Sequence, residues 1–116
     1  CALPILAESV CVFWLRLTGW RILARRMKAR PGSGLGEIDI AARRGKTVAF
    51  IEVKARATHD MARDTIGFMQ RARIARAAEV FVMRHEDCAG CEVRFDVMVV
   101  DRHYIPLRIA DAWRPD

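Results

Sequence analysis

The chain has 116 residues, of which 53% are hydrophobic and 29% charged, a composition that excludes a disordered chain and indicates one globular domain. Its formal net charge of +6 favours a polyanionic partner, nucleic acid before an anionic membrane, although an ordinary solubilising surface gives the same value. Four cysteines without a small disulfide framework or an evident secretory signal predict a reducing, cytoplasmic environment. Residues 1–17 are apolar but too short for a full membrane span, so we expect a core helix and no membrane partner.

The predicted elements alternate between helices and strands. A strand–helix–strand step after a hairpin makes the two flanking strands parallel, which predicts an α/β domain with a mixed sheet flanked by helices in the order αβββαβ. In chain order, the patterns predict a helix over 4–18, a strand over 20–27, a Gly/Pro-rich loop over 29–36, hairpin strands over 37–44 and 47–56, a polar loop over 58–67, a helix over 68–85, a strand over 93–101, and a last strand or edge segment over 104–113.

Two charged residues interrupt the second strand of the predicted hairpin. In the sequence AFIEVKAR (49–56), Glu52 and Lys54 stand among apolar residues. Charged side chains are seldom buried unless they are paired or used. Because strand side chains alternate between faces, Glu52 and Lys54 share one face, and Ile51 and Val53 share the other. The strand is therefore predicted to anchor the fold with one face and present charges on the other.

The hairpin brings another acid to the charged face. If residues 45–46 form the turn, Asp39 directly faces Glu52. If residues 44–45 form it, the two acids are diagonal neighbours, and in either register their Cβ atoms lie roughly 5–8 Å apart. Like charges this close destabilise a sheet, whereas Mg²⁺ is commonly held by one or two carboxylates with water and phosphate. We interpret the pair as a candidate Mg²⁺ site; the alternative is a surface ion pair between Lys54 and one acid.

A third acid lies in the first predicted helix. Glu8 falls on or beside an otherwise apolar stripe, with Cys11, Val12 and Leu15 at i+3, i+4 and i+7. It is the only charged residue before Arg16. Its side chain either joins the acidic pair or extends from the helix edge to water, and the pattern leaves both alternatives open.

The segment GEIDIAARRGKTVAFIEVKAR, residues 36–56, resembles the signature of the YraN-like family of bacterial proteins. The likeness extends along the chain, since residues 7–23 resemble the family's first helix and strand and residues 94–101 its late strand. The family is placed in the PD-(D/E)xK nuclease superfamily. The resemblance therefore implies a restriction-endonuclease-like fold, similar to that of archaeal Holliday-junction resolvases, in a single nuclease-like domain over residues 1–116.

The resemblance also implies roles for individual residues. Asp39 and Glu52, with the backbone carbonyl of Val53, would bind Mg²⁺ or Mn²⁺, and Lys54 would activate or orient a water molecule. Glu8 matches a helix acid that some superfamily members use near a second metal. Gln70 stands where the family often has lysine, in a helix that can contact substrate. Apart from Gln70, the residues expected to contact nucleic acid are predicted from their positive charge and not from the resemblance; they are Arg43, Arg44, Arg56 and Arg73.

The sequence thus predicts a Mg²⁺- or Mn²⁺-dependent endonuclease that acts on DNA, with branched or structured DNA as the implied substrate and a homodimer as the implied assembly. Two alternatives remain open: a non-catalytic nucleic-acid-binding module, and a protein-interaction subunit that docks through its apolar first helix. Arg94 and Asp96 share a strand face, where they form a buried ion pair or support the site. No zinc site is expected at Cys88 and Cys91, because a structural site needs four ligands.

Overall fold

The structure is a computed structural model that describes residues 3–57 and 67–115. Every predicted element is present, with bounds within two residues of those expected. Apart from Gly67, the loop predicted over 58–67 lies outside the described residues. The elements are α1 (Leu3–Leu17), β1 (Arg21–Met27), β2 (Ile38–Arg44), β3 (Thr47–Ala55), α2 (Phe68–Arg84), the short 3₁₀ helix η2 (Glu86–Cys88), β4 (Glu92–Val100) and β5 (Pro106–Trp113).

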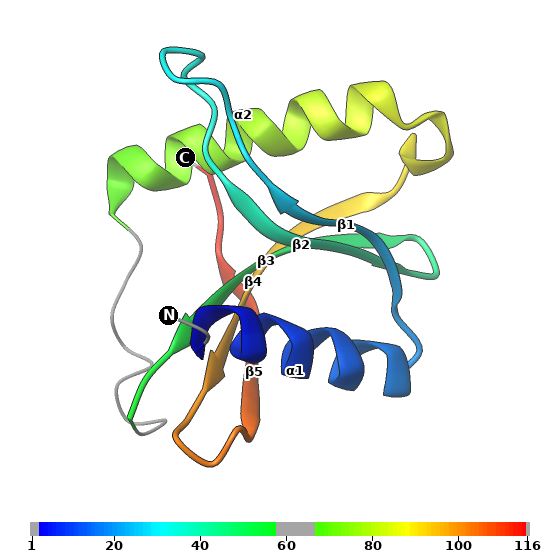
Figure 1. The fold of residues 1–116 in the computed structure, drawn as a ribbon. Coiled ribbons are helices and arrows are strands. Elements are labelled where there is room, and N and C mark those ends of the chain that lie inside the picture. Colours follow the sequence, from blue (N-terminus) through cyan, green and yellow to red (C-terminus); the bar gives the residue numbers. More distant parts are fainter. Residues whose placement is uncertain (1–2, 58–66, 116) are drawn as a thin grey trace.

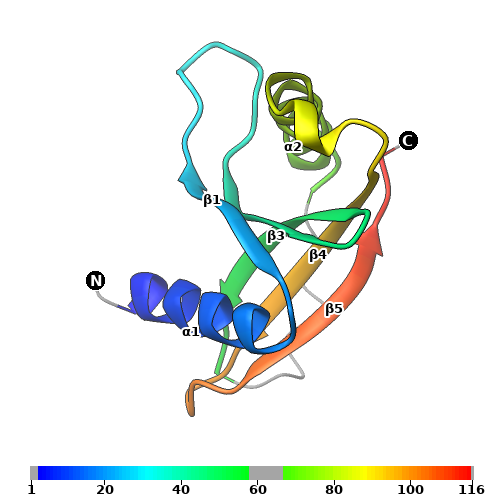
Figure 2. The ribbon, with the colours of Figure 1, turned by 90° about the vertical axis from the view of Figure 1, so that its right-hand side faces the viewer.

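One mixed sheet forms the centre of the molecule, with its strands in the order β1-β2-β3-β4-β5. β3 and β4 are parallel, as the predicted crossover requires, and the other neighbours are antiparallel. The two long helices lie on opposite faces of this sheet (Figures 1 and 2). The arrangement confirms the predicted α/β class and is compatible with a restriction-endonuclease-like fold.

The apolar stripe of α1 covers one face of the sheet. Cys11, Val12 and Leu15 are buried against strand residues that include Ile40 and Ile51. The i, i+3, i+4, i+7 spacing predicted from the sequence is therefore the packing stripe of this helix. No helix in the described part of the chain is long and apolar enough to cross a membrane.

α2 covers the other face of the sheet. Ile74, Ala78 and Phe81 are buried in a cluster with Phe50 and Phe95 from the two central strands. The rings of Phe50 and Phe81 meet edge to face with their centroids 5.6 Å apart, a favourable aromatic geometry. Alternate residues of β3 thus serve two separate cores, one under each helix.

The β2–β3 hairpin has the first of the two predicted registers. Arg44 pairs with Thr47, which leaves Gly45 and Lys46 as the turn, and Gly45 has a φ of 60° that glycine adopts without steric cost. The ladder continues to the pair formed by residues 40 and 51. One step further along this register lie Asp39 and Glu52.

A glycine sets the approach of α2 to the start of β2. A Cβ atom at Gly36 would lie 2.8 Å from the backbone nitrogen of Ile74, so no other residue fits without movement of one segment. The Gly36 N–H also donates a 2.9 Å hydrogen bond to the carbonyl oxygen of Arg73. This contact fixes the segment that leads into Asp39 against the helix that carries Gln70.

Candidate functional site

The candidate site lies where β2 begins and β3 ends. The N-terminal ends of α1 and α2 lie on this same side of the molecule (Figure 1). Asp39 and Glu52 together line two clefts there, a smaller one of about 510 Å³ and a larger one of about 1190 Å³. The smaller cleft is also lined by Glu8, Val53, Lys54 and Arg56, and the larger by Gln70 and Arg73.

Beyond the last pair of the hairpin ladder, the Asp39 side chain accepts a hydrogen bond from the backbone of β3 in place of a backbone carbonyl of β2. Its Oδ2 accepts a 2.8 Å hydrogen bond from the backbone N–H of Val53, which fixes the orientation of the carboxylate. Burial raises the pKa of Asp39, and the nearby charges of Glu52, Glu8 and Glu37 raise it further, against the lowering effect of the Val53 hydrogen bond. Burial and the neighbouring carboxylates therefore both disfavour the ionised form of Asp39.

Glu52 and Lys54 form an ion pair at the same end of β3. The Lys54 Nζ lies 3.4 Å from Glu52 Oε1, and the two side chains are only 13% and 20% exposed. The other carboxylate oxygen, Glu52 Oε2, is buried and has no hydrogen-bond partner among the described residues. The predicted alternative of an ion pair with Lys54 is thus present, but it satisfies only half of the Glu52 carboxylate.

The donor set at this site fits a hard divalent cation. Mg²⁺ and Mn²⁺ prefer oxygen ligands and are often bound by two carboxylates, with water and phosphate as the other ligands. A cation beside Asp39 and Glu52 would partner the buried Glu52 Oε2 and offset the burial of Asp39. The described residues contain no cluster of three or more metal-binding side chains, so the protein would supply two carboxylates and leave the other positions open.

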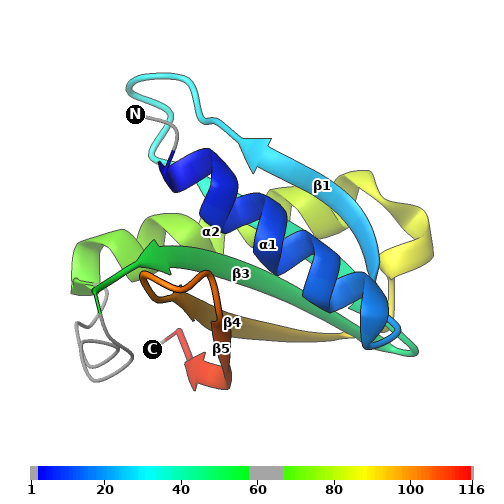
Figure 3. The same ribbon diagram turned by 60° about the horizontal axis from the view of Figure 1, so that its bottom comes forward.

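Glu8 is buried on the inner side of α1 and does not extend to water. Its Oε1 accepts hydrogen bonds from the Nε atoms of Arg25 at 2.9 Å and Arg26 at 3.1 Å, both on β1, which runs beside α1 (Figure 3). Of the two predicted alternatives, the structure therefore favours a place at the smaller cleft, where Glu8 forms ion pairs with two arginines. The sequence alone predicts no role at the site for these two arginines.

Arg43 and Arg44 lie at the turn of the hairpin, at the opposite end of β2 from Asp39. Arg43 donates to the carbonyl oxygens of Gly45 and Asp87, and Arg44 donates to the carbonyl oxygen of Thr18. The two residues line neither cleft, so the structure does not bring them together with the acidic pair. Their contact with nucleic acid stays a prediction.

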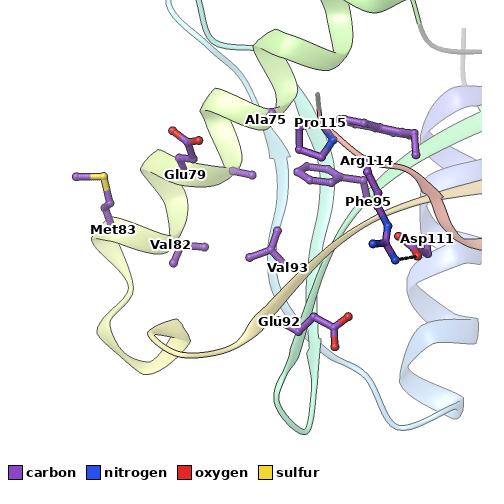
Figure 4. Close-up of a pocket in the computed structure, with 12 residues that line it drawn as sticks. Ala75, Glu79, Val82, Met83, Glu92, Val93, Phe95, Asp111, Arg114 and Pro115 are labelled. Carbon is purple, nitrogen blue, oxygen red and sulfur yellow. Dashed lines mark hydrogen bonds and ion pairs between the residues drawn. The ribbon is translucent and has the colours of Figure 1, made fainter.

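An apolar groove of about 770 Å³ lies between α2 and the strands β4 and β5 (Figure 4). Its floor includes Val82, Val93 and Phe95, and acidic residues such as Glu79 and Glu92 lie along it. None of the predicted site residues lines this groove. It is roomier than the smaller cleft, but its acidic residues are exposed, unlike the partly buried Asp39 and Glu52, so it offers no comparable cation site.

Residues 7–100 of the chain match a family described as uncharacterised protein family UPF0102. The UPF0102 protein amb4503 of Paramagnetospirillum magneticum is 50% identical over 110 residues, which are 95% of this chain and 85% of that relative. UPF0102 proteins of Parvibaculum lavamentivorans and Methylorubrum extorquens are 41% and 43% identical over 97% and 92% of this chain, and 82% and 80% of those relatives are covered. The matched segment includes every residue of the two clefts named above except Ile5.

Proposed function

The chain belongs to the UPF0102 family, also called the YraN family, and from its acidic pair we propose that it is a metal-dependent endonuclease that hydrolyses phosphodiester bonds in DNA. The family is assigned to the PD-(D/E)xK nuclease superfamily. The observation that carries the proposal is the buried Oε2 of Glu52, which has no hydrogen-bond partner within residues 3–57 and 67–115 and lies beside Asp39, whose pKa is raised by burial. A partly buried acid pair with an unsatisfied carboxylate oxygen lowers stability unless a cation binds to it.

The chain's own residues divide the work at the site. Asp39, Glu52 and the carbonyl oxygen of Val53 would hold Mg²⁺ or Mn²⁺. When bound, such a cation lowers the pKa of water and stabilises the charge that develops on phosphate. The Val53 N–H keeps the Asp39 carboxylate in one orientation. The Lys54 ammonium, 3.4 Å from Glu52, would donate to the attacking water or to a phosphate oxygen.

Basic and polar residues around the two clefts support a nucleic-acid substrate. Arg56 lines the smaller cleft, and Gln70 and Arg73 line the larger one, where they can contact phosphates on either side of the acidic pair. The net charge of +6 favours the approach of DNA at low salt. We propose branched or structured DNA as the substrate and the cytoplasm as the location, in keeping with the free thiols of Cys11, Cys88 and Cys91.

Cleavage of labelled DNA tests this proposal. Purified protein with Mg²⁺ or Mn²⁺ is expected to cut a four-way junction, a flap, a duplex or a single strand, and EDTA is expected to stop the reaction. Glu52→Gln should reduce the rate at least ~100-fold, because metal-assisted stabilisation is worth several kcal/mol. Glu92→Gln, which removes an exposed acid of the distant groove, is the matched control and should cut like the wild type. Failure of the wild type to cut any of these substrates would contradict the proposal.

We propose a second role, self-association with another copy of the chain, in which the outer face of α1 forms the interface. The helix is covered by the sheet on one side only, and its remaining large apolar side chains are exposed to solvent. A contiguous apolar patch on a soluble domain commonly marks an interface. The exposed side chains are those of Ile5, Leu6, Phe13, Trp14 and Leu17.

The spacing on α1 is compatible with an antiparallel pair of helices around a two-fold axis. In one register Leu6 of each copy faces Leu17 of the other, and Val10 faces Phe13, so the patch complements itself. Arg16 is the only charged residue on α1 outside the buried Glu8, and this register separates the two copies of Arg16. A second copy therefore meets no like charge along the helix.

The oligomeric state tests this role. Sedimentation equilibrium is expected to show a dimer that Phe13→Glu dissociates, because a charge would enter the apolar interface. Met83→Glu, at an exposed apolar residue of the groove in Figure 4, is the control and should leave the dimer intact. A wild type that stays monomeric at high concentration would contradict the assignment, and a dimer broken only by Met83→Glu would place the interface in the groove.

A further inference from the structure

Arg26 has an unusual backbone conformation for a long side chain. Its φ is 51°, in the left-handed region that glycine and asparagine enter most readily and that other residues rarely adopt. Residues held in this region must be stabilised by their surroundings, and they often lie at binding sites. Arg26 stands at the end of β1 that borders the smaller cleft, so its conformation bears on the site.

The consequence of this conformation is that two consecutive residues point the same way. Neighbouring side chains on a regular strand lie on opposite faces. Arg25 and Arg26 nevertheless both reach Oε1 of Glu8, with Nε–Oε1 distances of 2.9 Å and 3.1 Å. The left-handed residue breaks the alternation and brings a second guanidinium to a carboxylate that already has one.

The two arginines differ in their other contacts. Arg25 also lies 3.4 Å from the hydroxyl of Ser9, and its side chain is 34% exposed. The Arg26 side chain is 50% exposed, lines the smaller cleft with Asp39 and Glu52, and has no further partner among the described residues. Since a single arginine is enough to neutralise Glu8, Arg26 adds a net positive charge beside the acidic pair.

The geometry points to Arg26 as a phosphate-binding residue of the smaller cleft. Its Nε is fixed by Glu8, which leaves the two terminal nitrogens to donate to the oxygens of one DNA backbone phosphate, a planar arrangement that guanidinium suits. Glu8 acts as the positioning residue that holds this guanidinium at the cleft. The inference rests on the proposed function, because it requires DNA to enter the cleft that contains Asp39 and Glu52.

A purely structural role for Arg26 makes a different prediction. If Arg26 served only to neutralise Glu8, its replacement would lower stability and would affect DNA binding only through unfolding. If Arg26 binds phosphate, Arg26→Asn should lower DNA affinity while the unfolding temperature stays equal or rises, because asparagine tolerates the left-handed region. The two roles are therefore separated by measuring binding and stability on the same variants.

The experiment uses the full chain and a fluorescein-labelled duplex and four-way junction, titrated at several salt concentrations in a buffer with Ca²⁺ instead of Mg²⁺. The control is Arg21→Asn, which removes an exposed arginine from the other end of β1, where it pairs with Asp87. We expect Arg26→Asn to weaken binding about tenfold and to lower the slope of log K against log salt by about one. Arg26→Lys should retain the slope, and Arg21→Asn should change the affinity less than about twofold.

Each other outcome has a defined meaning. Wild-type affinity in Arg26→Asn, or a loss no greater than that of Arg21→Asn, would overturn the assignment of Arg26 and leave the proposed function in place. A lower affinity together with a lower unfolding temperature would assign Arg26 a structural role and would also overturn it. A wild type that binds none of the DNA probes in a salt-dependent way would refute the proposed function and this inference with it.

Discussion

Two acidic sites in the same sheet, Asp96 on one side and the pair Asp39 and Glu52 on the other, differ in how many hydrogen-bond donors and cations surround them. Asp96 on β4 is fully buried and accepts two hydrogen bonds from Arg94, at 3.0 Å and 2.8 Å, while Arg108 lies 3.6 Å away. The backbone N–H of Asp111 adds a 2.8 Å hydrogen bond to the same carboxylate. This carboxylate thus has two cations and a backbone donor.

The acidic pair at the end of β3 has far fewer donors. Asp39 accepts a hydrogen bond from the Val53 N–H, and Glu52 Oε1 pairs with the Lys54 ammonium. Glu52 Oε2 has no hydrogen-bond partner among the described residues. Burial works against ionisation here and raises the pKa of Asp39. A buried acid whose hydrogen-bond partners are all present is accounted for by the fold, whereas a partly buried acid pair that lacks a cation indicates a site for a ligand.

The largest effect is expected from Asp96→Ala. This change leaves Arg94 and Arg108 partly buried without their carboxylate and should lower the free energy of unfolding by about 3 to 5 kcal/mol. Urea unfolding followed by circular dichroism measures it. Arg114→Ala, which breaks an exposed ion pair with Asp111, is the control and should leave stability nearly unchanged. Similar losses in both variants would contradict the contrast between the clusters.

A smaller effect of opposite sign is expected from Asp39→Asn in the absence of divalent cations. Because the pKa of Asp39 is raised in the folded state, the folded protein binds the proton of this carboxyl more tightly than the unfolded chain does. The resulting stabilisation is fully present below pH 3.8 and is lost as the pH rises through the folded-state pKa. The variant should therefore be more stable than the wild type at neutral pH, and the difference should vanish in acid. Unfolding measured between acidic and neutral pH checks this. A variant less stable than wild type at neutral pH would mean that ionised Asp39 stabilises the fold.

The smallest effect on the protein is expected from Cys11, where no residue is changed and only the reactivity of a thiol near Asp39 and Glu8 is measured. Burial raises the pKa of its thiol to about 12, and the charges of Asp39 and Glu8 add to the shift. Iodoacetamide at mildly alkaline pH should therefore modify Cys11 much more slowly than the half-buried Cys91 in the native protein, and at a similar rate in urea. Mass spectrometry of the peptides measures both rates. Equal rates in the native protein would show that Cys11 is neither buried nor near net negative charge.

Local rules are enough to predict the position of the acidic pair. The alternation of side chains along β3 placed Glu52 and Lys54 on one face, and the turn at Gly45 set the register that carries Asp39 to Glu52. The ion pair of Arg94 with a residue two positions away follows from the same alternation. These relations depend on short stretches of backbone, so the sequence contains them directly.

Relations between distant segments could not be predicted in this way. Arginine rarely adopts a left-handed backbone conformation, so the sequence does not predict the one found at Arg26. The contact of Arg26 with Glu8 depends on β1 lying beside α1, which the sequence does not predict either. Arg108 reaches Asp96 only because β5 pairs with β4. Arg43 was assigned by charge alone, and the length of β2 carries it away from the clefts.

The central claim is that Asp39 and Glu52 bind a divalent cation. Electron paramagnetic resonance of Mn²⁺, combined with the unfolding temperature at increasing Mn²⁺ concentrations, tests it without any assumption about the substrate. The wild type is expected to take up Mn²⁺ and to unfold at a higher temperature as the site fills, whereas Asp39→Asn with Glu52→Gln should do neither. An unfolding temperature that does not depend on Mn²⁺ in the wild type, or equal uptake by the double variant, would contradict the claim.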